Sequence, residues 1–331
     1  MKKSVFVGID VSKSSFDAAI FEPSSGALTH KQFKNNNRGF ATFLKWIRSV
    51  ASLQNCLFCM EDTGSYSYGL ACFLASKKAD LCLESAYRIK HSVGIKRKKT
   101  DKADAEMIAQ FAFRFADKLK LYTPPVAVVA QLKTLISFRL RLIKQKTSII
   151  TAIEAHKQLD GYVDISFMMR SLNQQLKALK EQIKKCNEQI DRLMQQDQQL
   201  HHQNHLLCSI PGVGKVIAAQ VIAYTYGFTK FKDWRKFACY VGTAPFPHQS
   251  GTSIKKRTQV SSIANKKLKA LLSMGAVNTL RTENEYHVYY RRKIKEGKHH
   301  MVVINAIRNK LISRMFAVIR RDTPYVKLQL Q

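Results

Sequence analysis

The chain has 331 residues, and its 55 Lys and Arg against 23 Asp and Glu give a formal net charge of +32. The length predicts two domains or three small ones, and a hydrophobic content of 45% excludes a wholly disordered chain. The sequence has no run of about 18 apolar residues, which excludes a membrane span. Its start turns charged at Asp10 before a signal-peptide core could form, and its seven cysteines show no paired pattern, which disfavours secretion.

Residues 1–125 alternate predicted strands and helices. The predicted strands are short apolar runs at 5–10, 16–21, 56–61 and 80–85, of which the first two form a hairpin. The predicted helices lie at 39–52, at 68–77 and from Asp101 through Phe115. This alternation is typical of an α/β sheet covered on both faces. The domain is predicted to end at Thr123-Pro124-Pro125, because proline blocks helix continuation.

Residues 126–204 are predicted to be helical. Apolar residues recur there at alternating spacings of four and three, at Leu172, Leu176, Leu179, Ile183, Cys186, Ile190 and Leu193. Such a heptad seam indicates either an amphipathic helical hairpin within one chain or a coiled-coil arm that joins two copies. We assign the segment as a helical, coiled-coil linker and oligomerisation region, with both readings open.

Residues 205–331 are predicted to be mostly helical and hold most of the charge. Helices at 216–224, 265–280 and 301–319 flank a polar, basic loop at 242–262. From residue 206 onward there are 23 Lys and Arg against five Asp and Glu. An excess of this size predicts a polyanionic partner, for which nucleic acid is the usual candidate.

Four acidic residues stand where a metal site would need them. Asp10 and Glu61 end predicted strands, and Asp101 and Asp104 lie three apart at the start of a predicted helix. Strand ends of α/β sheets are where sites form, and clustered carboxylates need cations such as Mg²⁺, which prefers oxygen ligands. Two such ions are a familiar arrangement for phosphoryl transfer. The alternative is that Asp101 caps the helix, Asp104 stabilises its first turn, and the other two are turn residues after strands.

Three further segments are candidates for contact with nucleic acid. A Pro-Gly-Val-Gly turn opens a predicted helix whose N–H groups can hold a phosphate, as in a helix-hairpin-helix element, unless it is a plain connection. The candidate contacts are Lys96, Arg97, Lys98, Lys99, Gly212, Gly214, Lys215, Lys255, Lys256 and Arg257.

A hydroxyl in the group Ser250-Gly251-Thr252-Ser253, beside the last basic run, could attack a phosphodiester. The alternative is a plain turn, because Ser-Gly pairs usually mark turns.

Five sequence blocks occur in a familiar order and spacing. They are Gly8-Ile9-Asp10-Val11-Ser12-Lys13, Met60-Glu61-Asp62-Thr63-Gly64-Ser65-Tyr66, Lys99-Thr100-Asp101-Lys102-Ala103-Asp104-Ala105, Ser209-Ile210-Pro211-Gly212-Val213-Gly214, and Phe237 to Gly242 followed by Ser250-Gly251-Thr252-Ser253. Together they resemble the DEDD transposases of bacterial insertion sequences, a family that includes bridge-RNA-guided recombinases and pilin-gene invertases. The resemblance covers nearly the whole chain, although the middle segment matches only in its helical character.

The resemblance implies a RuvC-like, RNase H-type domain at 1–125 whose Asp10, Glu61, Asp101 and Asp104 hold Mg²⁺, with Mn²⁺ as the alternative ion. It implies a C-terminal transposase domain with a nucleophilic serine, which motif matching places at Ser250, with Ser253 as the fallback. The implied partners are DNA as donor and target, a structured guide RNA and further copies of the chain in a dimer or tetramer. The implied location is the bacterial cytoplasm, near the nucleoid.

In the implied reaction, Ser250 attacks a phosphodiester and leaves a phosphoserine link and a free 3′-hydroxyl. One rival is a RuvC-like junction nuclease that uses water, and another is a DNA invertase that acts without a guide RNA. A third is a non-catalytic nucleic-acid-binding protein whose acids only cap helices. A covalent DNA adduct separates the serine route from the junction nuclease, because only the serine route leaves protein attached to a DNA end.

Overall fold

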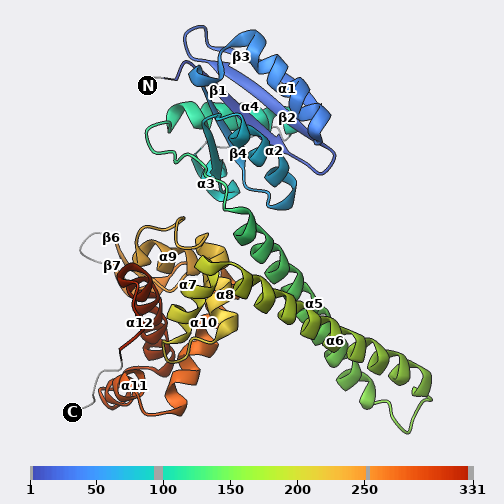
Figure 1. Ribbon diagram of the computed structural model, residues 1–331, viewed down its shortest axis with the longest axis vertical. Coiled ribbons are helices and arrows are strands. Elements are labelled where there is room, and N and C mark those ends of the chain that lie inside the picture. The colour runs from blue at the N-terminus through green and yellow to red at the C-terminus, as the bar shows by residue number, and fades with distance from the viewer. Residues whose placement is uncertain (1–2, 93–99, 251–253, 327–331) are drawn as a thin grey trace. The chain divides into compact units, whose positions relative to one another are not determined.

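The computed structural model describes residues 3–92, 100–250 and 254–326, with the backbone alone for 248–250 and 254–257. The chain divides into two compact units, Met1–Pro124 (unit 1) and Pro125–Gln331 (unit 2) (Figure 1). None of the helices in these described ranges is long and apolar enough to cross a membrane.

Unit 1 contains a mixed sheet with helices on both faces. Its elements are β1 (Val5–Val11), β2 (Ser15–Glu22), β3 (Ala27–Lys34), α1 (Asn37–Val50), η1 (Leu53–Asn55), β4 (Cys56–Glu61), α2 (Ser65–Ser76), β5 (Leu81–Glu84), α3 (Ala86–Ser92) and α4 (Asp101–Arg114). The strand order is β3-β2-β1-β4-β5, in which β1 to β3 are antiparallel neighbours and β4 and β5 run parallel to β1. The prediction of an α/β domain is therefore confirmed in its coarse form.

The two faces of this sheet have separate apolar cores. Successive side chains of a strand point to opposite faces. On one face, β1 packs against α1 and α2 through Val5, Val7, Ile9, Phe40, Phe43, Ile47, Leu70 and Leu74. On the other face, the sheet packs against α4 through Phe6, Leu57, Cys59, Met107, Ile108 and Phe111. Side chains on the second face therefore lie on the same side of the sheet as α4.

Gly8 allows α4 to lie directly on the sheet. A Cβ at this position would lie 2.1 Å from the amide nitrogen of Ala109 and 2.2 Å from the carbonyl oxygen of Ala105, both in the α4 backbone. Backbone atoms cannot rotate away from such a clash as the end of a flexible side chain can. Any larger residue would therefore move α4, including its first turn with Asp101 and Asp104.

We expect Gly8→Ala to lower the free energy of unfolding of unit 1 by about 1–3 kcal/mol, the usual range for overpacking. Gly69→Ala is the matched control, because Gly69 lies within α2 and its added Cβ meets only Phe40 ring carbons at 3.7 Å. That change should be neutral or stabilising by about 0.5–1 kcal/mol. Urea unfolding followed by circular dichroism measures both, and equal effects of the two changes would contradict the close packing at Gly8.

The strand β3 was not expected from the sequence. Of its eight residues only Phe33 is buried, because β3 is the edge strand and most of its side chains face solvent. An exposed, polar edge strand has little apolar alternation to indicate it.

Unit 2 combines a long helical hairpin with a helical core. Its elements are α5 (Ala127–Lys157), α6 (Ser166–Gln196), α7 (Gln198–Cys208), α8 (Lys215–Thr225), α9 (Trp234–Val241), β6 (Pro245–Ser250), β7 (Ile254–Val260), α10 (Lys266–Asn278), η2 (Thr279–Arg281), α11 (Glu285–Lys295) and α12 (His300–Arg321). Fully buried residues of α8, α9, α10 and α12 form its core, including Val221, Phe237, Leu272 and Leu311.

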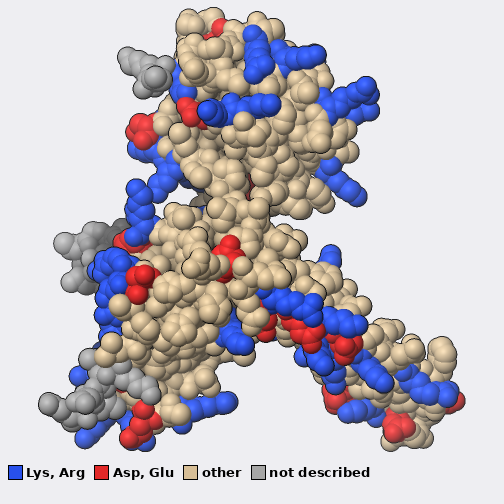
Figure 2. All heavy atoms as spheres, in the orientation of Figure 1, with Lys and Arg blue, Asp and Glu red and all other residues tan. Residues whose placement is uncertain are grey.

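The helices α5 and α6 lie side by side as an arm (Figure 1). The seven residues of the predicted heptad seam are buried or half-buried, and Cys186 donates a hydrogen bond from Sγ to the Leu135 carbonyl of α5 at 3.6 Å. The structure thus contains the helical hairpin within one chain, while the joining of copies by this arm stays a prediction. Figure 2 shows Lys and Arg interspersed with Asp and Glu along the arm, which is typical of a solvated helix face.

The prediction of a loop over 242–262 is wrong for residues 245–250 and 254–260. These residues form an antiparallel pair, β6 and β7, with a register shift between Phe246 and His248. The sequence gives little sign of this pair because β6 contains two prolines, and residues 258–260 of β7 are exposed, so strict apolar alternation is absent.

Candidate functional site

A row of carboxylates crosses the sheet of unit 1 on the face that α4 covers. Glu61 and Glu84 are register partners on β4 and β5, and Asp10 and Asp17 are register partners on β1 and β2. The parallel pair β1 and β4 is in register at Ile9 and Met60, and Asp10 and Glu61 each follow this pair by one residue. Since adjacent strands lie about 4.8 Å apart, the two carboxylates can reach one ion.

The two outer carboxylates of the row have partners of their own. Asp17 is 5% exposed, and its oxygens lie 2.7 Å from His30 Nε2 and 3.0 Å from Gln32 Nε2. Glu84 forms an ion pair of 2.7 Å with Arg88. Within the described ranges, Asp10 and Glu61 have no such hydrogen bond or ion pair from a side chain. Among the side chains that the structure describes, the centre of the row is therefore the part without a counter-charge.

The first turn of α4 adds Asp101 and Asp104. The helix is capped by Thr100, whose side chain accepts a hydrogen bond from the Ala103 amide at 3.2 Å. The alternative in which Asp101 caps the helix is therefore wrong. Asp101 is exposed and Asp104 is half-buried.

The electrostatics of Asp10 show that these acids act on one another. The pKa of Asp10 is raised from 3.8 to about 6, first by burial and then by the carboxylates of Asp104, Asp101, Glu61 and Asp17. Burial and like charges both disfavour the ionised form of a carboxyl group. The structure thus brings all four sequence-predicted acids within electrostatic range of one another around Asp10.

The side chains around Asp10 offer oxygen ligands, which suit a hard divalent cation. Oxygen atoms are the ligands that Mg²⁺ prefers, and Thr63, two residues after Glu61, has a buried hydroxyl with no hydrogen-bond partner among the described residues. Among the described residues, no three acidic, His or Cys side chains lie close enough together to hold a metal as they stand.

The side chains of the predicted serine and of several predicted cations lie outside the part of the chain that the structure describes. Ser250 is the last residue of β6, and its side chain is not described. In β7, the side chains of Lys255, Lys256 and Arg257 are likewise not described. Neither backbone nor side chain is described for Ser253, Lys96, Arg97, Lys98 and Lys99.

The predicted Pro-Gly-Val-Gly turn connects α7 and α8 in unit 2. Gly212 has a φ of +83°, and a Cβ there would lie 2.4 Å from Thr279 Cγ2 and 2.6 Å from the Gly275 carbonyl oxygen, so this position requires glycine. Gly214 and Lys215 are exposed at the start of α8, which has no side-chain cap. The exposed side of the turn is therefore open to a phosphate at this helix N-terminus.

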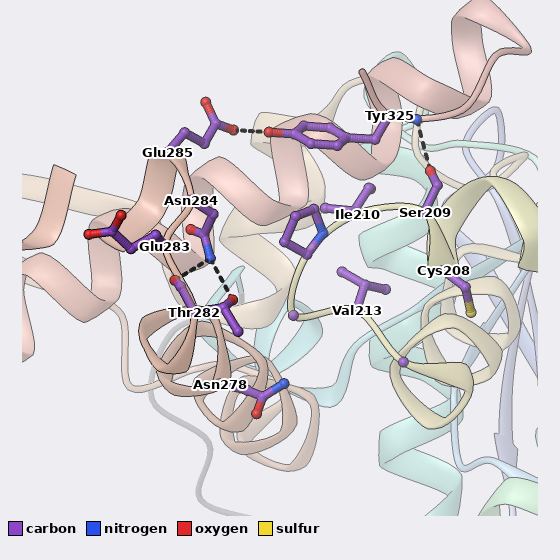
Figure 3. A pocket seen from close by; sticks show the side chains of 13 residues that line it. Cys208, Ser209, Ile210, Val213, Asn278, Thr282, Glu283, Asn284, Glu285 and Tyr325 are labelled. Carbon is purple, nitrogen blue, oxygen red and sulfur yellow. Dashed lines mark hydrogen bonds between the residues drawn. The ribbon is translucent and has the colours of Figure 1, made fainter. Parts of the chain in front are cut away.

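A cavity of about 580 Å³ is lined by this same turn, from Ile210 to Gly214 (Figure 3). Tyr325 crosses it, donating from its hydroxyl to Glu285 Oε1 at 2.8 Å and from its backbone N–H to Ser209 Oγ at 2.8 Å. Burial opposes ionisation of Glu285, but hydrogen bonds from Arg314 and Tyr325 lower its pKa overall. With Glu283 also in the wall, this cavity is unsuited to a phosphate.

Sequence reasoning missed Asp17 and Glu84 as parts of the carboxylate row. Both stand in predicted strands, and Asp17 lies seven residues after Asp10 in a hairpin, which makes them cross-strand neighbours. The strand register of that hairpin can be derived from the sequence, and it identifies Asp17 as the neighbour of Asp10. Glu84 requires the parallel pairing of β4 and β5, which no local pattern gives.

Comparison with known proteins gives matches over most of the chain. Residues 7–164, which include all four acids, match the DEDD transposase model of IS110 elements. Residues 204–291, which include the turn and Ser250, match the model described as "Transposase IS116/IS110/IS902 family". The protein is therefore a DNA transposase or recombinase.

Full-length similarity extends to two pilin gene-inverting proteins. Those of Moraxella bovis and Moraxella lacunata are each 28% identical over 97% of this chain and 98% of their own length. The IS110 insertion element's uncharacterized 43.6 kDa protein of Streptomyces coelicolor is 30% identical over 38% of this chain and 31% of its own length. The chain belongs to the IS110-type family of DEDD transposases.

Proposed function

We propose that this transposase is a site-specific recombinase that cuts and rejoins DNA with a divalent cation held by Asp10, Glu61, Asp101 and Asp104. Mg²⁺ is the proposed ion and Mn²⁺ the alternative. The observation that carries the proposal is the centre of the carboxylate row, where Asp10 and Glu61 have no counter-charge among the described side chains and the pKa of Asp10 is about 6. The strand order β3-β2-β1-β4-β5 supports the RuvC-like, RNase H-type interpretation of unit 1.

The side chains have distinct proposed tasks. Asp10 and Glu61, from adjacent strands, would hold the ion, and Asp101 and Asp104 would complete its ligands from α4. When bound, the cation supplies Lewis acidity at the scissile phosphate. Arg88 and His30 keep Glu84 and Asp17 occupied, so the ion is directed to the middle of the row.

Ser250 is the proposed nucleophile. Its Oγ forms a bond to phosphorus while the bond from phosphorus to the 3′-oxygen breaks. The serine loses its proton, and the leaving 3′-oxygen gains one, which leaves a phosphoserine link and a free 3′-hydroxyl. Attack by a 3′-hydroxyl of another strand reverses these steps and restores the serine, so no ATP is needed.

A trapping experiment tests this function. The purified chain is incubated with Mg²⁺ and labelled DNA that carries the ends of its element, and denatured in detergent. We expect label to stay with the protein until protease is added. Cleaved DNA without attached protein would overturn the serine route in favour of a nuclease that uses water.

The C-terminal excess of cations supports DNA binding through Lys215 and the exposed start of α8. We expect Lys215→Met to weaken binding of all DNA sequences alike and to reduce the slope of log K against log salt by about one. Lys184→Met, which removes the same charge from the exposed face of α6, should leave the slope unchanged. Fluorescence anisotropy at several salt concentrations measures both slopes, and equal slopes for the two variants would contradict a phosphate contact at Lys215.

Two features of the assembly remain part of the proposal. A dimer or tetramer is supported by apolar side chains near the end of the arm, where Tyr162 is 88% and Phe167 80% exposed. Mixing Ser250→Ala and Asp10→Ala chains should then restore part of the activity, and no recovery would argue against cooperation between chains.

A structured guide RNA is supported by the positive charge of the chain. Sequencing of co-purified RNA should give one discrete species, whereas bulk cellular RNA would contradict guiding.

A second candidate function is DNA inversion without a guide RNA. The full-length similarity to the two pilin gene-inverting proteins favours it. Sequencing the products distinguishes the two, because inversion leaves the segment between its flanks in reversed orientation.

A further inference from the structure

Unit 2 contains a second, larger cavity of about 1210 Å³. It lies between α9, α12 and the base of the β6–β7 pair, with single residues from α10 and α11 in its wall. Most small-molecule pockets have volumes of roughly 300–1000 Å³. This cavity therefore has room for a nucleotide with its flanking phosphates.

The wall of this cavity is positively charged. Its described residues include Arg235, Lys269, Arg308 and Lys310, and none of them is Asp or Glu. Burial, and then the charge of Arg308, lower the pKa of Lys269, which shows that the two cations act on each other. Cations that face one another without an acid attract an anion.

Arg308 is the central member of this group. Its side chain is 5% exposed, and its Nη1 donates to Asn305 Oδ1 at 3.2 Å. Its Nε is buried without an acceptor, and within the described ranges the guanidinium has no ion pair. Buried charges are normally paired, because an unpaired buried charge destabilises the fold. An arginine kept in this state is suited to an anion that enters the cavity.

The surroundings of Arg308 hold it in place. Asn305 and Asn309 each donate from Nδ2 to the carbonyl oxygen of Thr243 at 2.8 Å, and the Thr243 hydroxyl donates to Asn309 Oδ1 at 2.9 Å. Thr243 is fully buried and stands two residues before β6. These bonds connect α12 to the start of the β6–β7 pair, so that the hydrogen-bond partner of Arg308 is itself fixed.

The cavity also has an apolar side. Tyr289 lines it with Met301 and Val302, which are 51% and 60% exposed although both are apolar. Lys310 places its ammonium 4.6 Å from the Tyr289 ring centroid. Aromatic and apolar side chains beside cations are the combination on which nucleic-acid bases stack while their phosphates are neutralised.

We propose that this cavity binds one unpaired nucleotide of a single-stranded segment, with its phosphate between Arg308 and Lys269 and its base against Tyr289. A duplex base pair could not place its base in this way, so the site distinguishes single strands from duplexes. Both DNA and RNA contain the required phosphate and base.

The inference deepens the proposed function and rests on it for the origin of the strand. Pro245, the first residue of β6, lines the cavity, and Ser250 ends the same strand five residues later, about 17 Å along an extended chain. Strand exchange creates unpaired ends near the reacting serine. The cavity would hold such an end while the partner strand is exchanged.

The test measures binding alone, in full-length Ser250→Ala protein, so that it is independent of catalysis. The probes are fluorescein-labelled octamers of deoxythymidine and of uridine, and a 20-base-pair duplex. We expect Arg308→Met to weaken octamer binding by about 10–100-fold, the effect of losing hydrogen bonds to a charged group, and duplex binding by less than about twofold. Arg308→Lys should recover part of the octamer affinity. A preference for one octamer assigns the strand to DNA or RNA.

The matched control is Lys267→Met, which removes one charge from the exposed face of α10 and lies outside the cavity wall. It should weaken octamer and duplex binding equally and slightly. If Arg308→Met does not fold, Lys269→Met is used with the same expectation. Octamer binding unchanged in these cavity variants, or lost in step with duplex binding, would overturn the proposal. The cavity variants can lose octamer binding as expected while the trapping experiment gives no covalent adduct. That result would overturn the proposed serine chemistry and would still support nucleotide binding in the cavity.

Discussion

Replacing Asp10 by Asn should greatly slow DNA cleavage and, without metal, make the protein more stable. Loss of a metal ligand is expected to lower the cleavage rate on the order of 10²–10⁴-fold. The full pKa shift of Asp10, from 3.8 to about 6, corresponds to about 3 kcal/mol. Since the carboxyl is only half-buried and solvent screens it, we expect the gain in the free energy of unfolding at pH 7.5 to be about 1 kcal/mol.

The pH dependence follows from the same shift. Because the pKa of Asp10 is higher in the folded state than the ordinary 3.8, the folded protein binds this proton more tightly. Its contribution to stability is fully present below about pH 4 and is lost as the pH rises through about 6. Asp10→Asn has no carboxyl group to ionise at this position, so its stability should not decrease in this way as the pH rises. Mg²⁺ should raise the melting temperature of the unmodified protein above pH 6 and leave that of Asp10→Asn unchanged.

Asp117→Asn is the matched control, because Asp117 is exposed in the same unit and lies outside the carboxylate row. It should change neither cleavage nor the response to Mg²⁺. Thermal unfolding in EDTA and in Mg²⁺ gives the stabilities, and gel assays give the cleavage rates. A less stable Asp10→Asn protein, or one that still responds to Mg²⁺, would contradict the charge account of the site.

Replacing Ser250 by Ala should remove the covalent protein–DNA adduct and lower strand transfer by at least about 10³-fold, as expected for loss of a nucleophile. The carboxylates lie in unit 1 and Ser250 in unit 2, so metal binding should be unaffected. The melting temperature in Mg²⁺ should therefore rise by the same amount as in the unmodified protein. Trapping in detergent and a metal titration measure the two properties separately.

Ser253→Ala tests the choice of serine within the Ser-Gly-Thr-Ser group. We expect it to keep the adduct, because motif matching assigns the nucleophile to the first serine. An adduct that persists in Ser250→Ala and disappears in Ser253→Ala would move the role to the second serine. Persistence in both variants would remove this group from the chemistry.

Apolar strands and the start of α4 could be predicted from the sequence, because their signals are local. β1 and β4 are continuous buried runs, and α4 begins at an aspartate after a capping threonine. The edge strand β3 could not, because only Phe33 of its eight residues is buried. The pair β6–β7 could not, because β6 contains two prolines and residues 258–260 of β7 are exposed.

The four acids could be named from the sequence, but their arrangement depends on long-range pairing. Asp10 and Glu61 are separated by 51 residues and become neighbours only because β4 pairs in parallel with β1. The approach of Asp101 and Asp104 depends on Gly8, which lets α4 lie against the same strand. The partners of Asp17 and Glu84 are likewise set by tertiary structure, so it could not be foreseen that, among the described side chains, only the outer carboxylates of the row have counter-charges.

Anomalous scattering from Mn²⁺ tests the metal site most directly. Crystals of Ser250→Ala protein with bound DNA would be grown in Mn²⁺, and diffraction recorded near the manganese absorption edge. We predict a peak between Asp10 and Glu61, within ligand distance of an α4 carboxylate. Density that places Mn²⁺ elsewhere, with Asp10 and Glu61 turned away from it, would contradict the account.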